Sequence, residues 1–354
     1  RRLAEREGGF RVFRLVAAGP DLPIAGAEVG VDVEVWRDPM PDHDRDDQEH
    51  GAAGPRAEAD ARYVATRRQV WGTRLPAEAW TGDERDRPFG EITDHPHLFE
   101  VTEPIDVVYT WVDGSDPVWQ ERRAAFLGER PDPVNPLAAN PGRYTCHDEL
   151  RYSLRSLEMY AGWVRNVYLV TDGQVPEWLA TDHPRLCVVD HREIFAPDAL
   201  DALPTFNSHA IEASLHRIDG LAEHFVYFND DMFLGRAVVP ETFFEPNGLA
   251  RAFLSEARIA GYADNETIAF DTGAIRGSQL LFGRYGRVPA RKPHHAPYAL
   301  RRSVLADLER EFAEDIAATV RSRFRSATDV STAAALAHHY GIATGRAIAA
   351  PAST

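Results

Sequence analysis

The sequence predicts an α/β fold with a mostly parallel β-sheet flanked by helices. Short runs rich in Val, Ile, Tyr and Phe, typical of buried strands, recur between residues 104 and 230. Segments with apolar residues at helical spacing separate these runs, and such alternation is typical of βαβ units. Acidic residues follow within two positions of the end of each of four such runs, at the edge where open parallel sheets bind ligands.

Four strands and several helices account for this alternation. The predicted strands are 105–112, 167–170, 186–189 and 225–228. Apolar residues at i, i+4 and i+7 predict helices over 148–160 and 207–221, and we add a short helix over 175–180. Farther along the chain, 243–291 should form loops with one or two strands, and 297–312 and 331–340 should be helical.

The composition divides the chain into three parts. Residues 1–100 are predicted to form a small β-rich accessory region, with alternating strands near 10–16 and 29–35. A flexible loop rich in Asp, Gly and Pro is expected over 39–60. Residues 101–345 hold the predicted α/β domain, and 346–354 are expected to fray.

The overall charge bears on the class of partner. The chain carries 39 basic and 55 acidic residues, a net charge of −16, which argues against a nucleic-acid partner. An acidic protein that binds an anionic substrate needs a cation or a local group of arginines to offset the repulsion. A run of about eighteen apolar residues, as a membrane span requires, is absent. With only two cysteines, the chain is expected in a reducing compartment, the cytoplasm.

The acidic residues at the strand ends indicate a metal site. The acids are Asp113, Asp116, Asp172, Asp190, Asp230 and Asp231, and the neutral amide of Asn229 precedes the last two. Clustered carboxylates repel one another unless a cation lies among them, and Mg²⁺ or Mn²⁺ binds carboxylate oxygens and bridges to phosphates. The alternative is a set of turns, since Asn, Asp and Asp-Gly favour turn conformations. That alternative is strongest for Asp172, which precedes a glycine, and weaker for the doubled acids Asp230 and Asp231.

Two pairs of arginines are candidates for binding phosphate. Arg151 and Arg155 are four residues apart on a predicted helix and share a face. Arg323 and Arg325 alternate along an extended segment and would also share a face. A guanidinium can grip two phosphate oxygens at once. The alternatives are ion pairs on an exposed helix for the first pair and a solvated basic stretch for the second.

Histidines are the candidates for a general base. His294 and His295 lie between Pro293 and Pro297, which restrict the backbone of this loop. A general base must reach the hydroxyl that it deprotonates, and a restricted loop suits that role. His209 lies on the predicted helix before the fourth strand.

Together these blocks resemble the Stealth family of sugar-1-phosphate transferases, which includes bacterial capsule polymerases and the animal N-acetylglucosamine-1-phosphotransferase. Residues 105–117, with the sequence IDVVYTWVDGSDP, resemble the first conserved region of the family. Residues 149–156, 203–212 and 227–231 resemble the second region, and 293–297 and 323–326 resemble the third. The similarity covers 104–340, and the fourth conserved region is not recognisable before Thr354.

The resemblance implies a Rossmann-like catalytic domain over 101–345 that moves a hexose-1-phosphate from a nucleotide-sugar to a carbohydrate hydroxyl and releases a nucleoside monophosphate. It implies Mg²⁺ or Mn²⁺ held by Asp230 and Asp231. The implied catalytic residues are His295 as the base, Arg151, Arg325 and Asp231. For binding the donor it implies Trp111 and Asp113, to which we add Asp116, Arg155, His209, Asn229 and Arg323.

The resemblance also implies the partners. They are a nucleotide-sugar such as UDP-N-acetylglucosamine and a polysaccharide or glycan acceptor, which the protein would meet in the cytoplasm, at the inner face of the membrane through peripheral association. From the residues alone, two other functions stay open. A metal-dependent glycosyltransferase would use the same donor but release a nucleoside diphosphate, and a non-catalytic relative would only bind carbohydrate.

Overall fold

The computed structural model describes residues 98–128, 144–259 and 269–351, together with the backbone of six short strands among the first 65 residues. The chain divides into two compact units, Arg1–His97 and Leu98–Thr354. In the first unit three antiparallel pairs form. They are β1 (Gly9–Val12) with β4 (Val31–Glu34), β2 (Val16–Gly19) with β3 (Leu22–Ala25), and β5 (Trp36–Arg37) with β6 (Val64–Ala65). The loop expected over 39–60 lies outside the described residues, so the accessory region stays a prediction.

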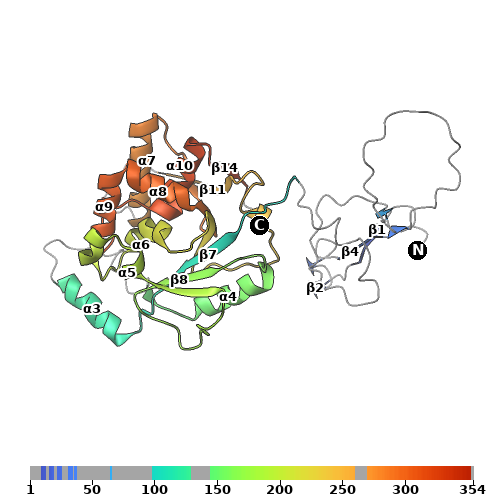
Figure 1. Ribbon diagram of the computed structural model, residues 1–354, viewed down its shortest axis with the longest axis horizontal. Coiled ribbons are helices and arrows are strands. Elements are labelled where there is room, and N and C mark those ends of the chain that lie inside the picture. Colours follow the sequence, from blue (N-terminus) through green and yellow to red (C-terminus); the bar gives the residue numbers. More distant parts are fainter. Residues whose placement is uncertain are drawn as a thin grey trace, which may run out of the picture. The chain divides into compact units, whose positions relative to one another are not determined.

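The second unit is built on a five-stranded sheet (Figure 1). Its strands, in spatial order, are β13 (Tyr298–Arg301), β10 (His224–Asn229), β7 (Ile105–Thr110), β8 (Val167–Thr171) and β9 (Leu186–Asp190). β10, β7, β8 and β9 run parallel, and β13 pairs antiparallel with β10 at one edge. All four predicted strands are therefore confirmed, and the α/β fold with a mostly parallel sheet is confirmed with them.

The central strands are covered on both faces, which explains their continuous apolar sequences. Val108, Tyr109, Val226 and Tyr227 are fully buried on neighbouring strands. Asp106 is the buried exception at the start of β7, and its carboxylate accepts hydrogen bonds from the Arg165 guanidinium and two backbone N–H groups. A buried charge is tolerated when it is paired in this way.

Helices and a second small sheet complete the unit. The helices are α3 (Pro117–Gly128), α4 (Glu149–Tyr160), α5 (His191–Ile194), α6 (Ser208–Ser214), α7 (Ala269–Tyr285), α8 (Arg302–Glu311), α9 (Ala313–Arg321) and α10 (Ala337–Ala343). The last four lie together in Figure 1, coloured orange to red. The second sheet has the order β12 (Arg291–Pro293), β11 (Ala250–Arg258) and β14 (Ala347–Ala350).

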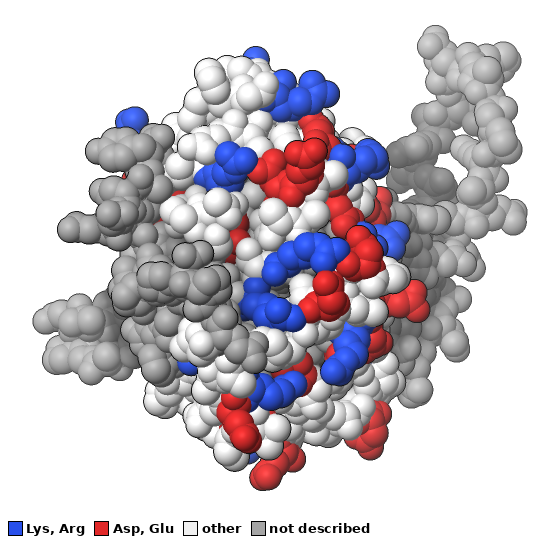
Figure 2. All heavy atoms as spheres, turned by 90° about the vertical axis from the view of Figure 1, so that its left-hand side faces the viewer, with Lys and Arg blue, Asp and Glu red and all other residues white. Residues whose placement is uncertain are grey.

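Shorter helical turns connect these elements. Three are 3₁₀ helices, Pro197–Ala202, Leu215–Arg217 and Pro240–Thr242, and Thr332–Leu336 forms one turn of π-helix. In the described part of the chain, no helix combines the length and apolarity that a membrane crossing requires. Figure 2 shows that acidic and basic side chains are interspersed over one face of the unit.

Two predicted helices differ from the structure at their ends. The helix predicted over 297–312 is a strand in its first part, because Tyr298–Arg301 pair with β10. α8 then begins at Arg302, where the Glu223 carboxylate accepts hydrogen bonds from the N–H and hydroxyl of Ser303. The helix predicted over 207–221 ends as α-helix at Ser214 and continues as a 3₁₀ turn.

Other predictions of secondary structure are wrong or only partly confirmed. Residues 175–180 form a turn, with the N–H of Leu179 bonded to the Pro176 carbonyl, and no helix. The segment 243–291, expected to consist of loops with one or two strands, contains the strand β11 as expected but also the long helix α7. The helix predicted over 331–340 starts with the π-turn and runs on to Ala343. The fraying expected over 346–354 does not hold for Ala347–Ala350, which form β14 beside β11.

Candidate active site

Hydrogen bonds from α4 anchor the loop that follows β10. The Ser153 hydroxyl donates to the Met232 carbonyl, and the Ser156 hydroxyl accepts from the N–H of Leu234 at 3.0 Å. Tyr109 on β7 hydrogen-bonds Ser153 at 2.8 Å. These buried contacts fix the turn that carries Asp230 and Asp231, so both carboxylates project from a defined backbone at the carboxyl edge of the sheet.

Asp230 lies where negative charge is concentrated. Burial, together with the neighbouring carboxylates of Asp231 and Glu149, raises its pKa to about 6. Glu149 is in the first turn of α4. A carboxyl group whose charge is disfavoured by its surroundings is one that a cation would stabilise in the ionised form.

His295 meets Asp231 at the same edge. Its Nε2 lies 3.3 Å from each carboxylate oxygen of Asp231, although 64 residues separate the two in the chain. The antiparallel pairing of Tyr298 with Tyr227 accounts for this contact, because it brings the residues before β13 opposite those after β10. The hydrogen bond that His295 donates to Asp231 raises the pKa of His295, and the same bond lowers the pKa of Asp231.

Asp230 and Asp231 are also the predicted ligands of a metal ion. In the described part of the chain, no three or more His, Cys, Asp or Glu side chains come together as a metal site. Mg²⁺, however, usually takes only one or two carboxylates and completes its shell with water and substrate phosphates. Asp230 and Asp231 offer two carboxylates, and the raised pKa of Asp230 marks uncompensated negative charge. The donor set therefore fits a hard divalent cation.

The acids after β7 are held in a local turn. The Asp113 carboxylate accepts hydrogen bonds from the N–H and hydroxyl of Ser115. Asp116 accepts from the N–H of Val118 at the start of α3 and from the Gln174 side chain at 2.9 Å, and the bond from Gln174 is the main cause of its lowered pKa. Here the turn alternative describes the geometry.

Trp111 and Asn229 stand at the ends of neighbouring strands. Trp111 is buried, with 8% of its surface exposed, and its indole N–H has no partner in the structure. A buried donor without a partner calls for an explanation, and a ligand or water would satisfy it. Asn229 is the last residue of β10, paired with Thr110 of β7.

The arginines of α4 contact aromatic rings. The Arg151 guanidinium lies 5.8 Å from the centre of the Trp178 ring, and that of Arg155 lies 5.7 Å from the ring of Tyr152. Glu149 and Arg151 share the first turn of this helix. The backbone of Arg151 therefore lies two residues from Glu149, the residue whose charge acts on Asp230.

The two arginines of the later segment diverge. Arg325 donates to the Ser208 hydroxyl at 2.6 Å, at the start of α6. Arg323 donates to the Asp201 carbonyl and lies 4.6 Å from the centre of the Phe126 ring. These contacts lie on different residues, and the common phosphate-binding face stays a prediction.

His209 is placed differently from the expectation. Its side chain is buried, with 1% exposed, and its Nδ1 is 3.9 Å from Asp329. It is the second residue of α6 and is buried, so its position does not support direct contact with a donor.

Sequence reasoning missed residues whose role depends on contacts across the fold. Arg122, which the sequence did not single out, donates a hydrogen bond to Asp172 at 2.7 Å, and burial raises the pKa of Asp172. Gln174 links the turns after β7 and β8 through its bonds to Asp113 and Asp116. Neither a lone Arg on a helix nor a lone Gln in a turn gives a sequence signal for such a link.

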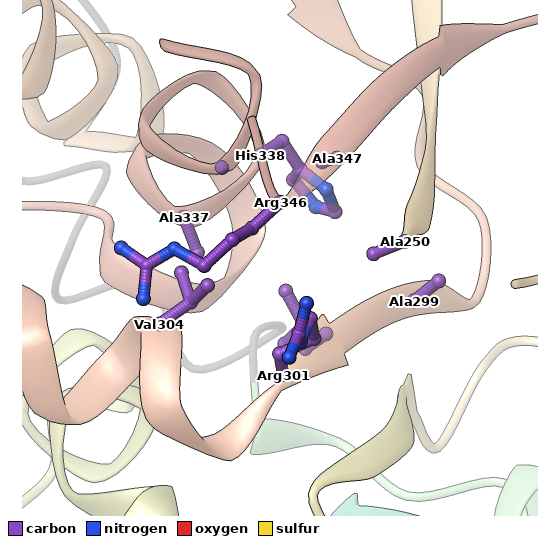
Figure 3. A pocket seen from close by; sticks show the side chains of 10 residues that line it. Ala250, Ala299, Arg301, Val304, Ala337, His338, Arg346 and Ala347 are labelled. Carbon is purple, nitrogen blue, oxygen red and sulfur yellow. The ribbon is translucent and has the colours of Figure 1, made fainter. Parts of the chain in front are cut away.

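A small pocket lies at the other end of the sheet (Figure 3). Arg301, Val304, His338 and Arg346 are among the residues that line it. Arg301 pairs with His224, the first residue of β10, whereas the acids follow the last residue of that strand. This pocket is therefore not the candidate active site.

An α/β unit with a carboxylate pair and a carboxylate-bound histidine at the carboxyl edge of its sheet belongs to the class of proteins that bind ligands at that edge. Three family models match the chain. They are Stealth protein conserved region 1 over 103–130, conserved region 2 over 143–252 and conserved region 3 over 294–342. The chain belongs to the Stealth family, and all the candidate residues described above lie within these three regions.

Curated relatives extend the comparison. Exopolysaccharide phosphotransferase SCO6023 of Streptomyces coelicolor is 54% identical over 253 residues, covering 70% of this chain and 42% of that protein. SCO2592 of the same organism is 43% identical over 349 residues, covering 96% and 35%. Exopolysaccharide phosphotransferase CpsY of Mycobacterium tuberculosis is 40% identical over 294 residues, covering 81% and 52%. The chain thus spans about half or less of the length of these relatives.

Proposed function

We propose that this chain is a phosphotransferase that moves a hexose-1-phosphate from a nucleotide-sugar to a hydroxyl of a polysaccharide or glycan. The observation that carries the proposal is the contact of His295 with Asp231 beside Asp230, at the edge where the sheet binds ligands. The printed names of the relatives, exopolysaccharide phosphotransferases, support the same class of reaction.

The proton transfer follows from the geometry. Because Nε2 of His295 faces the Asp231 carboxylate, Nε2 carries the proton in the neutral ring and Nδ1 keeps the lone pair. Nδ1 takes the proton of the acceptor hydroxyl while the oxygen of that hydroxyl bonds to the phosphorus next to the sugar. The bond from that phosphorus to the nucleoside monophosphate breaks, and the monophosphate leaves with the electron pair. Asp231 orients the ring and stabilises its protonated form.

Positive groups would stabilise the phosphoryl oxygens during transfer. Phosphoryl transfer depends mainly on positioning and electrostatics, and Arg151 and Arg325 are the proposed phosphate contacts of the chain. When bound, Mg²⁺ or Mn²⁺ at Asp230 and Asp231 would neutralise charge on the donor diphosphate. We further propose that the reaction takes place in the cytoplasm, where a protein bound peripherally at the inner face of the membrane would reach a growing polysaccharide.

The released nucleotide tests the proposal. The protein is incubated with UDP-N-acetylglucosamine, Mg²⁺ and a panel of sugar acceptors, and the nucleotide is identified by chromatography. UMP together with a phosphodiester-linked product is expected. UDP would show glycosyl transfer instead. If no nucleotide is released from this or other nucleotide-sugars, the result would favour a protein that only binds carbohydrate.

Asp230→Asn tests the metal assignment. The variant should lower turnover at least about 100-fold, because even residues that only support metal ligands contribute up to about that much. Chelation with EDTA should abolish turnover, and added Mg²⁺ or Mn²⁺ should restore it. Asp182→Asn is the matched control, since Asp182 is exposed and lies away from the strand ends. Normal turnover by Asp230→Asn would remove this residue from the metal site.

A further inference from the structure

A buried polar node lies behind Arg325. The carboxylate of Asp329 is 1% exposed, and its Oδ2 accepts hydrogen bonds at 2.8 Å from both the Asn207 side-chain amide and the N–H of Ser326. The same amide of Asn207 donates to the Ser322 carbonyl at 2.9 Å. One carboxylate and one amide therefore hold both ends of the segment that contains Arg325.

The same node fixes the start of α6. The side-chain oxygen Oδ1 of Asn207 accepts from the N–H of His209 at 3.1 Å and so caps this helix. The next residue, Ser208, is the one whose hydroxyl accepts from Arg325. The backbone on each side of the Arg325–Ser208 contact is thus tied to a single buried pair, Asn207 and Asp329.

Aromatic packing holds the middle of the segment. Phe324 stacks on Phe206 with ring centres 5.1 Å apart, and the N–H of Phe206 donates to the Arg323 carbonyl at 2.7 Å. This packing turns Phe324 inward and leaves its two arginine neighbours to other partners. The direction of Arg325 is therefore set by buried contacts on both sides of it.

We propose that Asp329 is a positioning residue for phosphate binding by Arg325, acting through Ser326 and Asn207. The proposal rests on the proposed function, because Arg325 contributes to transfer only if a phosphate binds there. Asp329 itself touches no substrate, since it is buried beneath the segment. A guanidinium that must meet phosphoryl oxygens in a defined geometry gains from a backbone that cannot shift, and misplacement by about 1 Å can cost about 100-fold in rate.

The buried carboxylate of Asp329 has a second neighbour, the His209 ring, whose nitrogens make no hydrogen bonds. Oδ1 of Asp329 and both ring nitrogens of His209 have no hydrogen-bond partner, and the ring faces the carboxylate from 3.9 Å. Asparagine at position 329 would keep one oxygen for Ser326 and Asn207 and place its amide in the space of Oδ1. Asp329→Asn should therefore retain most of the support, whereas Asp329→Ala removes all of it.

A double-mutant cycle on kcat/KM tests whether Asp329 acts through Arg325. Asp329→Ala should lower kcat/KM by about 10- to 100-fold, the usual effect of losing a supporting residue. In a chain that already carries Arg325→Ala, it should change kcat/KM by less than about threefold, because the group it positions is gone. Asp329→Asn should recover most of the activity. If the two alanine effects multiply, the proposal is overturned.

Limited trypsin digestion gives a readout that does not need activity. Trypsin cleaves after arginine, so cleavage after Arg323 and Arg325, followed by mass spectrometry, reports whether the segment is held. Asp329→Ala should be cut there faster than the parent chain. Asp106→Asn is the matched control, because Asp106 is equally buried and hydrogen-bonded at the far end of β7. Cleavage that is no faster in Asp329→Ala than in this control would also overturn the proposal.

These readouts separate the two proposals. If the parent chain shows no phosphotransfer, the proposed function fails, and the digestion alone decides whether Asp329 holds the segment. If Asp329→Ala does not fold, as judged by circular dichroism, the cycle and the digestion are run with Asp329→Asn. Its smaller loss of activity should likewise vanish in the Arg325→Ala background, and a loss that persists there would contradict the proposal.

Discussion

His338 should make this protein sensitive to mild acid. The residue lies in α10 and lines the pocket of Figure 3, where its ring is 5.3 Å from that of Tyr298. Its Nε2 has no partner, and burial lowers its pKa to about 3. Since an unfolded histidine titrates near pH 6.5, the folded and unfolded states bind protons differently over a wide range of pH.

The size of the effect follows from this difference. Above about pH 6.5 neither state binds the proton, so His338 does not influence stability. Below about pH 6.5 the unfolded state binds a proton at His338 and the folded state does not. The free energy of unfolding therefore falls as the pH falls, by up to about 1.4 kcal/mol per pH unit. Between about pH 7.5 and about pH 5.5 the loss attributable to His338 is about 1.4 kcal/mol. The loss continues down to the folded pKa of about 3.

Urea unfolding followed by circular dichroism measures this dependence. His338→Leu should lose about 1.4 kcal/mol less stability than the parent between about pH 7.5 and about pH 5.5, whatever its stability at the higher pH. His183→Gln is the control, because His183 is exposed in the folded chain, and it should behave as the parent does. An equal loss in His338→Leu and the parent would refute the reasoning.

Two further predictions concern the site itself. Gly114→Ala should destabilise the chain by about 1–3 kcal/mol, as overpacking does, because a Cβ there would lie 1.9 Å from the Tyr144 carbonyl oxygen. The melting temperature measures the loss of stability, and an unchanged melting temperature would show that this contact can relax. Asp231→Asn should lower the pKa of His295, since the hydrogen bond to Asp231 raises it. The base form is lost below that pKa, so the acid limb of the kcat/KM profile should move to lower pH while the maximum falls. An acid limb that stays in place would contradict the role of His295 as the base.

The strands could be predicted from sequence because strands that are buried on both faces of a sheet have continuous apolar sequences. α7 could not, since it carries three glycines, which weaken a helical pattern. The structure shows why two of them are there. A Cβ at Gly273 would lie 2.9 Å from the N–H nitrogen of Ser331, and one at Gly277 would lie 3.3 Å from Leu336. Close packing against a distant segment is information that the local sequence does not contain.

The site was predictable in part for a similar reason. Topology alone brings the acids after β10 to one edge of the sheet, and the family motif indicates His295. The support of that edge by Glu149, Ser153 and Ser156 depends on how α4 packs beneath the loop. The burial of His209 depends on the segment that carries Asp329. Such contacts form only between parts of the chain that are far apart in sequence.

The pairing of β13 with β10 has a practical consequence for engineering. This pairing brings His295 opposite Asp231, and the contacts of Ser153 and Ser156 hold the turn that carries Asp231. The 64-residue separation between the two therefore sets no distance that the intervening chain must keep. Residues 235–237 are exposed within that interval, and a Cβ at Gly235 would meet no atom within 4 Å. A peptide tag or a fluorescent reporter inserted there would leave the pair in place, so labelling close to the reaction centre need not come at the cost of its geometry.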